Sequence, residues 1–188
     1  MEIAVSLFLE KGYAATSTAD ICKAAKINKP TLYNFFENKR NLFFSCHMRS
    51  LEYHLQPFLE RAYSIENPSD RIKFMIQEFT RIICQHPELK VLIHETMSIN
   101  DEYFGKVRQI WKRHYELLRD TISKLKEEGL VLTDMPSSRA ALFMLGTMTW
   151  ITFWFNYEKK DSADELAKSA FSFFLNGLSA DKTLLLSK

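Results

Sequence analysis

Polar and basic side chains gather on one side of a short segment near the start of this 188-residue chain. Lys29, Thr31, Tyr33 and Asn34 take the outward positions of a predicted helix of about seven residues. Their hydroxyl, amide and ammonium groups suit phosphate oxygens and the base edges of DNA. Such a helix is roughly 10 Å long, so its end fits a major groove about 12 Å wide. The pattern therefore indicates a surface that could read double-stranded DNA.

Two capping signals predict the helices that position this segment. Ser17 and Asp20 form an S-x-x-D signature, which predicts a helix beginning near Thr18. Asn28 is a good N-cap for the next helix, and Pro30 fits its first turn, where a missing N–H group does little harm. Residues 26–28 leave room only for a tight turn, so the arrangement predicts a helix-turn-helix.

A third helix should follow directly. Asn38 can cap it, and Lys39 then lies in its first turn, where an ammonium group and backbone amides converge on an anion. Leu32, Phe35 and Phe36 fall on one side of the preceding helix, so these side chains are expected to face inward. The segment thus combines polar residues outward with aromatic residues inward.

The stretch LFLEKGYAATSTADICKAAKINKPTLYNFFENKRNLF resembles the DNA-binding domain of TetR-family transcriptional regulators. It covers about the first 45 residues, a quarter of the chain. Family members usually carry a dozen or so further residues before the first helix, whereas here that helix is expected to begin at Met1. Either such an arm is lacking or the sequence begins late. The family's residues appear in order and at the family's spacing: Leu7, Phe8, Gly12, Tyr13, Thr16, Ser17, Ile21, Ala24, Ala25, Thr31, Leu32, Tyr33, Phe36, Lys39 and Leu42.

The resemblance implies roles for individual side chains. Thr18, Tyr33 and Lys39 would touch phosphates, while bases would lie close to the side chains at positions 29, 31 and 34. With the cap residue, the expected DNA-binding set is Thr18, Asn28, Lys29, Thr31, Tyr33, Asn34 and Lys39. Lys29 suits guanine and Asn34 suits adenine.

Composition and charge agree with a folded intracellular protein. An apolar content of 46% with five Gly and five Pro supports a core and leaves little room for linkers. Cys22, Cys46 and Cys84 form no C-x-x-C pair, which favours a reduced, cytoplasmic compartment. Residues 1–50 hold seven Lys or Arg against four Asp or Glu, while the remainder holds eighteen against nineteen. The basic excess therefore coincides with the predicted DNA-binding segment.

The rest of the chain predicts helices only. About nine are expected in an all-α protein, with a three-helix DNA-binding domain at 1–45 and a six-helix effector-binding and dimerisation domain at 46–188. The later helices are expected over about 38–62, from the turn at 67–70 to before Pro87, and over 88–99, 101–128, 137–157 and 162–178.

Residues 140–157 carry no charged side chain, so a membrane span has to be weighed. The stretch is short for a spanning helix of about twenty residues, and burial against a partner explains it better. The final helix is also apolar over more than a single stripe. We expect a homodimer with a four-helix interface, the alternative being a larger core within one chain. The expected interface residues are Phe155, Leu166, Ala170, Phe171, Phe174 and Leu178.

The family resemblance also implies an apolar effector cavity, although ordinary core is the simpler interpretation of each residue. The candidates are Phe79, Ile83, Met97, Phe104, Trp111, Tyr115, Met144, Met148 and Trp154. Gly146, Trp150, Trp154, Phe155, Gly177 and Leu178 more weakly resemble the subgroup that senses acyl-CoA thioesters. A CoA phosphate could then meet basic residues that would otherwise form a solvated helix face: Lys106, Arg108, Lys112, Arg113 and Arg119.

Enzyme motifs are missing from the sequence. It has no G-x-S-x-G, H-E-x-x-H or phosphate-binding Gly-rich loop, so we expect neither catalytic residues nor a cofactor. The five histidines (47, 54, 86, 94 and 114) never pair at i, i+4, and no metal site is predicted. Together with the TetR resemblance, the sequence favours a cytoplasmic homodimeric repressor that binds a palindromic operator and, as the resemblance implies, responds to a small apolar effector. The alternative is a lipid or acyl-CoA carrier without DNA-directed activity.

Overall fold

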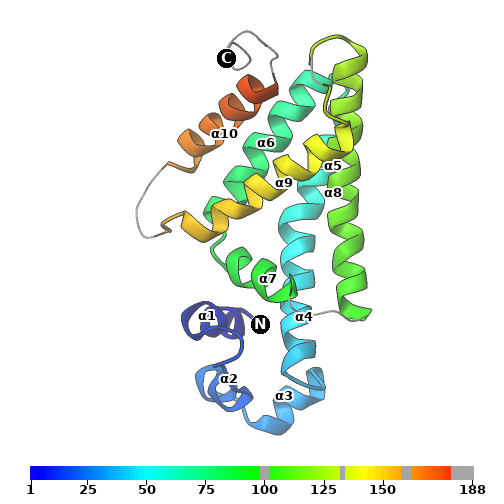
Figure 1. Cartoon of the computed structure of the whole chain (residues 1–188). Helices are drawn as coiled ribbons and strands as arrows, with labels where there is room; N and C mark the ends of the chain where they lie inside the picture. Colours follow the sequence, from blue (N-terminus) through cyan, green and yellow to red (C-terminus); the bar gives the residue numbers. More distant parts are fainter. Residues whose placement is uncertain (98–101, 132–133, 158–161, 179–188) are drawn as a thin grey trace. The chain divides into compact units, whose positions relative to one another are not determined.

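The computed structural model describes residues 1–97, 102–131, 134–157 and 162–178, and every regular element in these ranges is helical (Figure 1). The chain packs as two compact units. Unit 1 comprises residues 1–57 and 86–110, and unit 2 comprises residues 58–85 and 111–188. The all-α class is as predicted, and the expected division into two domains after residue 45 stays a prediction beside this division into packing units.

Unit 1 contains the predicted helix-turn-helix and a helix from later in the chain. Its core joins side chains from the N-terminal helices to Val91 and Leu92 of the later helix. The helices of this unit are α1 (Glu2–Lys11), α2 (Thr18–Ala25), α3 (Lys29–Phe35), α4 (Lys39–Ser50), α7 (Glu88–Met97) and the start of α8 (Glu102–Glu127). Because α7 packs on α1, the N-terminal helices share their core with it.

The predicted caps are present. The Ser17 hydroxyl accepts a hydrogen bond from the Asp20 N–H at 3.1 Å, while the Asp20 carboxylate accepts from the Ser17 N–H at 3.0 Å. Asn28 accepts from the Thr31 N–H at 2.8 Å, and Asn38 caps α4 in the same way. These bonds satisfy N–H groups that the first helical turn leaves without partners.

The helix expected over 38–62 is interrupted. After α4 the chain forms a π-helical turn, η1 (Leu51–Leu55), and then α5 (Gln56–Ser64). The Gln56 N–H donates to the Leu51 carbonyl, five residues back. Pro57 has no N–H, and in a regular α-helix its ring would clash with the carbonyl of Tyr53. The wider turn therefore lies where the proline makes regular α-helix unfavourable. Counting α4, η1 and α5 as one element gives, over the described ranges, the nine helices that the sequence predicts.

Unit 2 is built around α6 (Pro68–Gln85), which packs on α9 (Ser137–Trp154) and α10 (Ala163–Leu178). The face of α6 that carries Ile72, Met75, Ile76, Phe79 and Ile83 is buried, as its periodicity predicts. On another face, Arg81 forms ion pairs with Glu78 and with Asp164 of α10. The Tyr157 hydroxyl donates to the Ile83 carbonyl at 3.1 Å.

The uncharged α9 is only partly buried. Met144, Met148 and Ile151 lie in the core, whereas Phe143 and Trp150 are exposed. Within the described part of the chain, none of the helices has both the length and the apolar character needed to span a membrane.

Candidate functional site

The outward face of α3 carries the side chains expected to meet DNA. Lys29, Tyr33 and Asn34 are exposed, and Thr31 is half-buried. Leu32 points the other way and is buried in the core of unit 1. The outward face of α3 is therefore polar, and its inward side is held in place by core packing. A surface that binds DNA needs such a fixed geometry.

Thr18 and Tyr33, the two hydroxyl-bearing residues expected to contact phosphates, lie next to each other. Their oxygen atoms are 3.4 Å apart, although Thr18 begins α2 and Tyr33 lies in α3. The structure thus brings two phosphate-binding candidates from different helices to one place.

Asn28 and Thr31 are joined by the N-cap of α3. The Asn28 Oδ1 atom accepts hydrogen bonds from both the N–H and the hydroxyl of Thr31, at 2.8 and 2.6 Å. Since the Thr31 hydroxyl proton is used in this way, its oxygen has only acceptor capacity left. Thr31 is therefore suited to a base amino group rather than to a phosphate oxygen.

Lys39, expected to contact phosphate, donates hydrogen bonds within the protein. Its Nζ atom lies 2.8 Å from the Tyr13 carbonyl oxygen, 2.9 Å from that of Thr16 and 3.4 Å from that of Ala14. It also sits 4.3 Å from the centroid of the Tyr13 ring. These contacts use all three donors of the ammonium group. In this structure Lys39 fixes the connection between α1 and α2 to the start of α4.

Phe35 does not face inward as the sequence interpretation had it, because 76% of its surface is exposed. Helix α3 ends at Phe35, and Phe36 takes an extended conformation with φ −138° and ψ 118°. That change of direction lets Phe36 pack on the core and leaves Phe35 outside. The exposed Phe35 ring at the end of α3 is a candidate for contact with DNA that sequence periodicity missed.

The candidate effector region in unit 2 centres on a group of aromatic rings. The Phe79 ring lies 5.9 Å from Trp111, both of which the sequence selected. His114, for which the sequence predicted no functional role, lies edge-on to two rings. The distances between ring centroids are 4.6 Å to Phe79 and 5.1 Å to Phe58. The structure thus places a polar ring within an aromatic group.

His114 is fully buried, and neither ring nitrogen has a hydrogen-bond partner among the described residues. Burial lowers the pKa of its imidazole to about 3, so the ring is neutral at ordinary pH. One nitrogen then carries a donor and the other an acceptor, and leaving both unmatched is costly. Its spacing from the buried Val107 and Leu117 could have shown that His114 lies on the apolar face of α8.

The other ligand candidates are less clearly grouped. Ile83, Met144 and Met148 are buried, Tyr115 is half-buried and Trp154 is exposed. The side chains of the remaining two candidates, Met97 and Phe104, lie outside the described residues. A pocket of about 120 Å³ in unit 2 is lined by residues outside the candidate set, including Ile72, Leu125 and Phe171.

The apolar surface of α9 and α10 differs from the one expected for a dimer. Phe155 and Phe174 are buried within unit 2, while Leu166, Ala170 and Phe171 are half-buried. The side chain of Leu178 lies outside the described residues. The large apolar side chains that these helices expose are Leu142, Phe143, Trp150, Phe153, Trp154, Phe173 and Leu175.

Comparison with known proteins places both parts of the chain. Residues 1–46 match the model of bacterial regulatory proteins of the tetR family, and residues 66–178 match the tetracyclin repressor-like C-terminal domain. The chain is 22% identical to the probable acrEF/envCD operon repressor of Escherichia coli K12, covering 93% of this chain and 84% of that protein.

Solved structures share the fold. The TetR family transcriptional regulator PfmR from Thermus thermophilus is 26% identical with a TM-score of 0.85, covering 95% of this chain and 98% of that one. AibR, solved with isovaleryl coenzyme A and operator DNA, is 22% identical with a TM-score of 0.83, covering 92% and 94%.

Proposed function

The chain belongs to the TetR family of bacterial transcriptional regulators, and from that premise we propose that it is a homodimeric repressor released from its operator by a small apolar effector. The observation that carries the DNA-binding part is the exposed polar face of α3, anchored by Leu32 and by the caps at Ser17, Asn28 and Asn38. A DNA-binding regulator of this kind acts in the cytoplasm.

Each protomer would place α3 in a major groove. Lys29 and Asn34 would reach base edges, and Thr18 with Tyr33 would bind one phosphate region. Two-fold symmetry would then require a palindromic operator, with half-sites about one helical turn apart or slightly more. Binding should weaken steeply with salt, because counterions are released from the phosphates.

The proposed dimer interface is the exposed apolar face of α9 and α10. Trp150 and Phe153 stack 4.2 Å apart on this face, and Phe173 is exposed on α10. Surfaces with several exposed aromatic side chains are typical of protein interfaces. Two helices from each of two chains would form the four-helix arrangement that closes under two-fold symmetry.

The effector class is argued from His114. A ligand that enters among Phe58, Phe79 and Trp111 would meet apolar walls and one neutral imidazole. Such a site favours an apolar molecule with one carbonyl or hydroxyl group over a charged one, since an unpaired buried charge is expensive. An effector that favours a conformation in which the two DNA-binding segments of the dimer no longer match the half-site spacing would weaken DNA binding. DNA would weaken effector binding by the same factor.

An acyl-CoA would meet this requirement only with its acyl chain and thioester carbonyl among the aromatic rings and its charged phosphates outside them. AibR was solved with isovaleryl coenzyme A, and this chain carries exposed and half-buried basic residues along α8. Of these, Lys112 pairs with Glu116 at 3.6 Å and Arg119 with Asp120 at 2.7 Å. A thermal-shift screen that compares acyl-CoAs with free fatty acids and sterols tests this, because a ligand of the folded state raises its melting temperature.

The proposed regulator is tested by fluorescence anisotropy on the DNA beside its own gene, with random DNA as competitor, at two salt concentrations. Competitor-resistant, salt-sensitive binding supports the proposal, and Asn34→Ala should reduce the preference for the specific sequence. If binding to that DNA and to other intergenic DNA of the genome never exceeds binding to random DNA, the alternative of an apolar-ligand carrier takes its place.

A further inference from the structure

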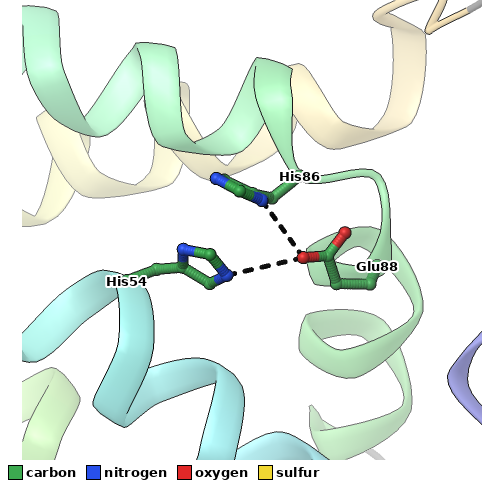
Figure 2. A group of neighbouring side chains, drawn as sticks. All are labelled: His54, His86 and Glu88. Carbon is green, nitrogen blue, oxygen red and sulfur yellow. Dashed lines mark hydrogen bonds and ion pairs between the residues drawn. The ribbon is translucent and has the colours of Figure 1, made fainter. Parts of the chain in front are cut away.

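Three side chains meet within unit 1, one from η1 and two from the start of α7 and the turn before it (Figure 2). His54 lies in η1, His86 lies between α6 and α7, and Glu88 is the first residue of α7. Both imidazole rings point a nitrogen at the same carboxylate oxygen of Glu88. The distances to that oxygen are 3.5 Å from the Nε2 atom of His54 and 3.2 Å from the Nδ1 atom of His86.

These distances match the spacing of ligands around a small metal ion. Zinc–nitrogen and zinc–oxygen bonds of about 2.0–2.2 Å in a tetrahedral site place neighbouring ligand atoms roughly 3.3 Å apart. The donor atoms of His54, His86 and Glu88 all lie within 4.8 Å of one another. The two imidazole rings lie beside each other, with their centroids 3.7 Å apart.

The three side chains are partly buried, so an ion could reach them from solvent and be partly enclosed by protein. The exposed fractions of the side chains are 21% for His54, 32% for His86 and 26% for Glu88. Burial, followed by the proximity of His86, lowers the pKa of His54 below its ordinary value, despite the opposing effect of Glu88. Burial thus favours the uncharged imidazole, which is the form of histidine that binds metals.

A cavity of about 500 Å³ adjoins this cluster. It lies within unit 1 and is lined by His54 and Glu88 together with residues of α1, α4 and α7, such as Val5, Cys46 and Leu92. Two histidines and one carboxylate leave coordination positions open on a metal ion. Water or a small exogenous ligand could reach those positions from the cavity.

We propose that His54, His86 and Glu88 form a binding site for one divalent transition-metal ion of the zinc class. The ion would link η1 directly to the start of α7, two elements that α5 and α6 separate in the sequence. Imidazole and carboxylate ligands suit Zn²⁺, Fe²⁺ and Ni²⁺, whereas Mg²⁺ and Ca²⁺ prefer oxygen ligands alone. The site involves neither the α3 face nor His114, so its test is independent of the proposed effector.

The test is a zinc titration of chelator-treated protein in competition with a chromophoric chelator. We expect one equivalent of Zn²⁺ per chain, a higher melting temperature with zinc, and no comparable effect of Mg²⁺. His86→Gln and Glu88→Gln should each weaken zinc binding by at least ~10-fold, in line with the sensitivity of metal sites to their supporting residues. His94→Gln is the matched control, because it removes a histidine from the same helix as Glu88 and should leave zinc affinity unchanged.

Cobalt distinguishes this site from adventitious binding to a thiol. The Co²⁺-loaded protein should show d–d absorption without a thiolate charge-transfer band, since the ligands are nitrogen and oxygen. Circular dichroism of the metal-free variants checks that they fold, and His54→Gln replaces any variant that does not. Stoichiometric zinc binding that survives in the folded variants, a cobalt spectrum with thiolate bands, or no binding at all would each overturn the proposal.

Discussion

The ammonium nitrogen of Lys39 lies 2.8 Å from the carbonyl oxygen of Tyr13 and 4.3 Å from the centroid of the same residue's ring. One side chain of α4 therefore binds both the backbone and the aromatic face of the segment between α1 and α2. Thr16 strengthens the same segment, since its hydroxyl contacts the Gly12 and Leu7 carbonyls at 2.8 and 3.1 Å. The orientation of α2, and of α3 after it, depends on this connection.

Replacing Lys39 by methionine should destabilise the protein by about 2 kcal/mol, because hydrogen bonds to a charged group are lost and partly buried carbonyls lose a partner. DNA affinity should fall on specific and random sequences alike. Urea denaturation and anisotropy measure the two effects. Lys29→Met serves as the comparison, since that exposed lysine should alter DNA binding and leave stability within about 0.5 kcal/mol.

Tyr33 and Asn34 are neighbours with different expected roles. Tyr33→Ala should weaken binding to all DNA sequences, because its hydroxyl lies with Thr18 in the proposed phosphate-binding region. Asn34→Ala should cost about 1–3 kcal/mol at one base pair and relax the preference there. Binding measured on single-base operator variants separates these effects. Equal losses on specific and random DNA for both mutants would refute the division.

Phe35 should contribute to DNA binding and little to stability. Its ring is largely exposed at the end of α3, where apolar contact with a thymine methyl group is available. Phe35→Ala should reduce specific DNA affinity by roughly 5-fold, or about 1 kcal/mol. Phe36→Ala is the opposite case, because this partly buried ring packs on the core and its loss should destabilise unit 1 measurably. Normal operator binding by Phe35→Ala would exclude the contact.

Lys26 ends α2 with a left-handed backbone conformation, at φ 54° and ψ 41°. The Ile27 N–H donates to the Cys22 carbonyl at 3.0 Å and the Lys26 N–H to the Lys23 carbonyl at 3.3 Å, as in a Schellman motif. Lys26→Gly should therefore stabilise the protein by about 1 kcal/mol, because glycine adopts this conformation without strain. Lys23→Gly, within the helix, should destabilise by a similar amount. Thermal melts of both variants check the sign.

Acid should destabilise the protein partly through His114. Its folded-state pKa of about 3 lies below the usual 6.5, so the unfolded chain binds a proton first as the pH falls. The stability that depends on the neutral ring is complete above pH ~6.5 and is lost between about pH 6.5 and 3, by up to ~1.4 kcal/mol per pH unit. His47, with a pKa lowered by burial to about 4, acts in the same direction.

His114→Leu should flatten this pH dependence between pH 7 and 5 in urea melts. It should also stabilise the effector-free protein, since it removes two ring nitrogens that lack partners among the described residues. Thr121→Val is the control, because the Thr121 hydroxyl is buried on the same helix but donates to the Leu117 carbonyl at 2.7 Å. An unchanged pH slope in His114→Leu would show that this histidine does not titrate as described.

The features that the sequence predicted correctly are local. Ser17, Asn28 and Asn38 form caps because the partner N–H group lies three residues along the same helix, which spacing alone reveals. The buried face of α6 follows in the same way from the spacing of its apolar residues.

The features that it missed depend on contacts between distant segments. Lys39 donates to carbonyl groups more than twenty residues earlier in the chain. His54 lies beside His86 and Glu88, although α5 and α6 separate them in the sequence. No local period encodes such meetings. Phe35 was misplaced for a related reason, because the end of α3, rather than its periodicity, decides which ring turns inward.

The shared core of α1 and α7 limits how this protein can be divided and recombined. Val91 and Leu92 pack with Phe8 and Phe43, so a fragment that stops at residue 57 would leave those aromatic side chains exposed to water. A chimera that exchanges DNA specificity with a relative should therefore carry residues 86–97 along with the N-terminal helices, or keep the host residues that face α7. In evolutionary terms, substitutions on α1 and α7 are expected to compensate one another, even though more than seventy residues separate the two helices in the chain.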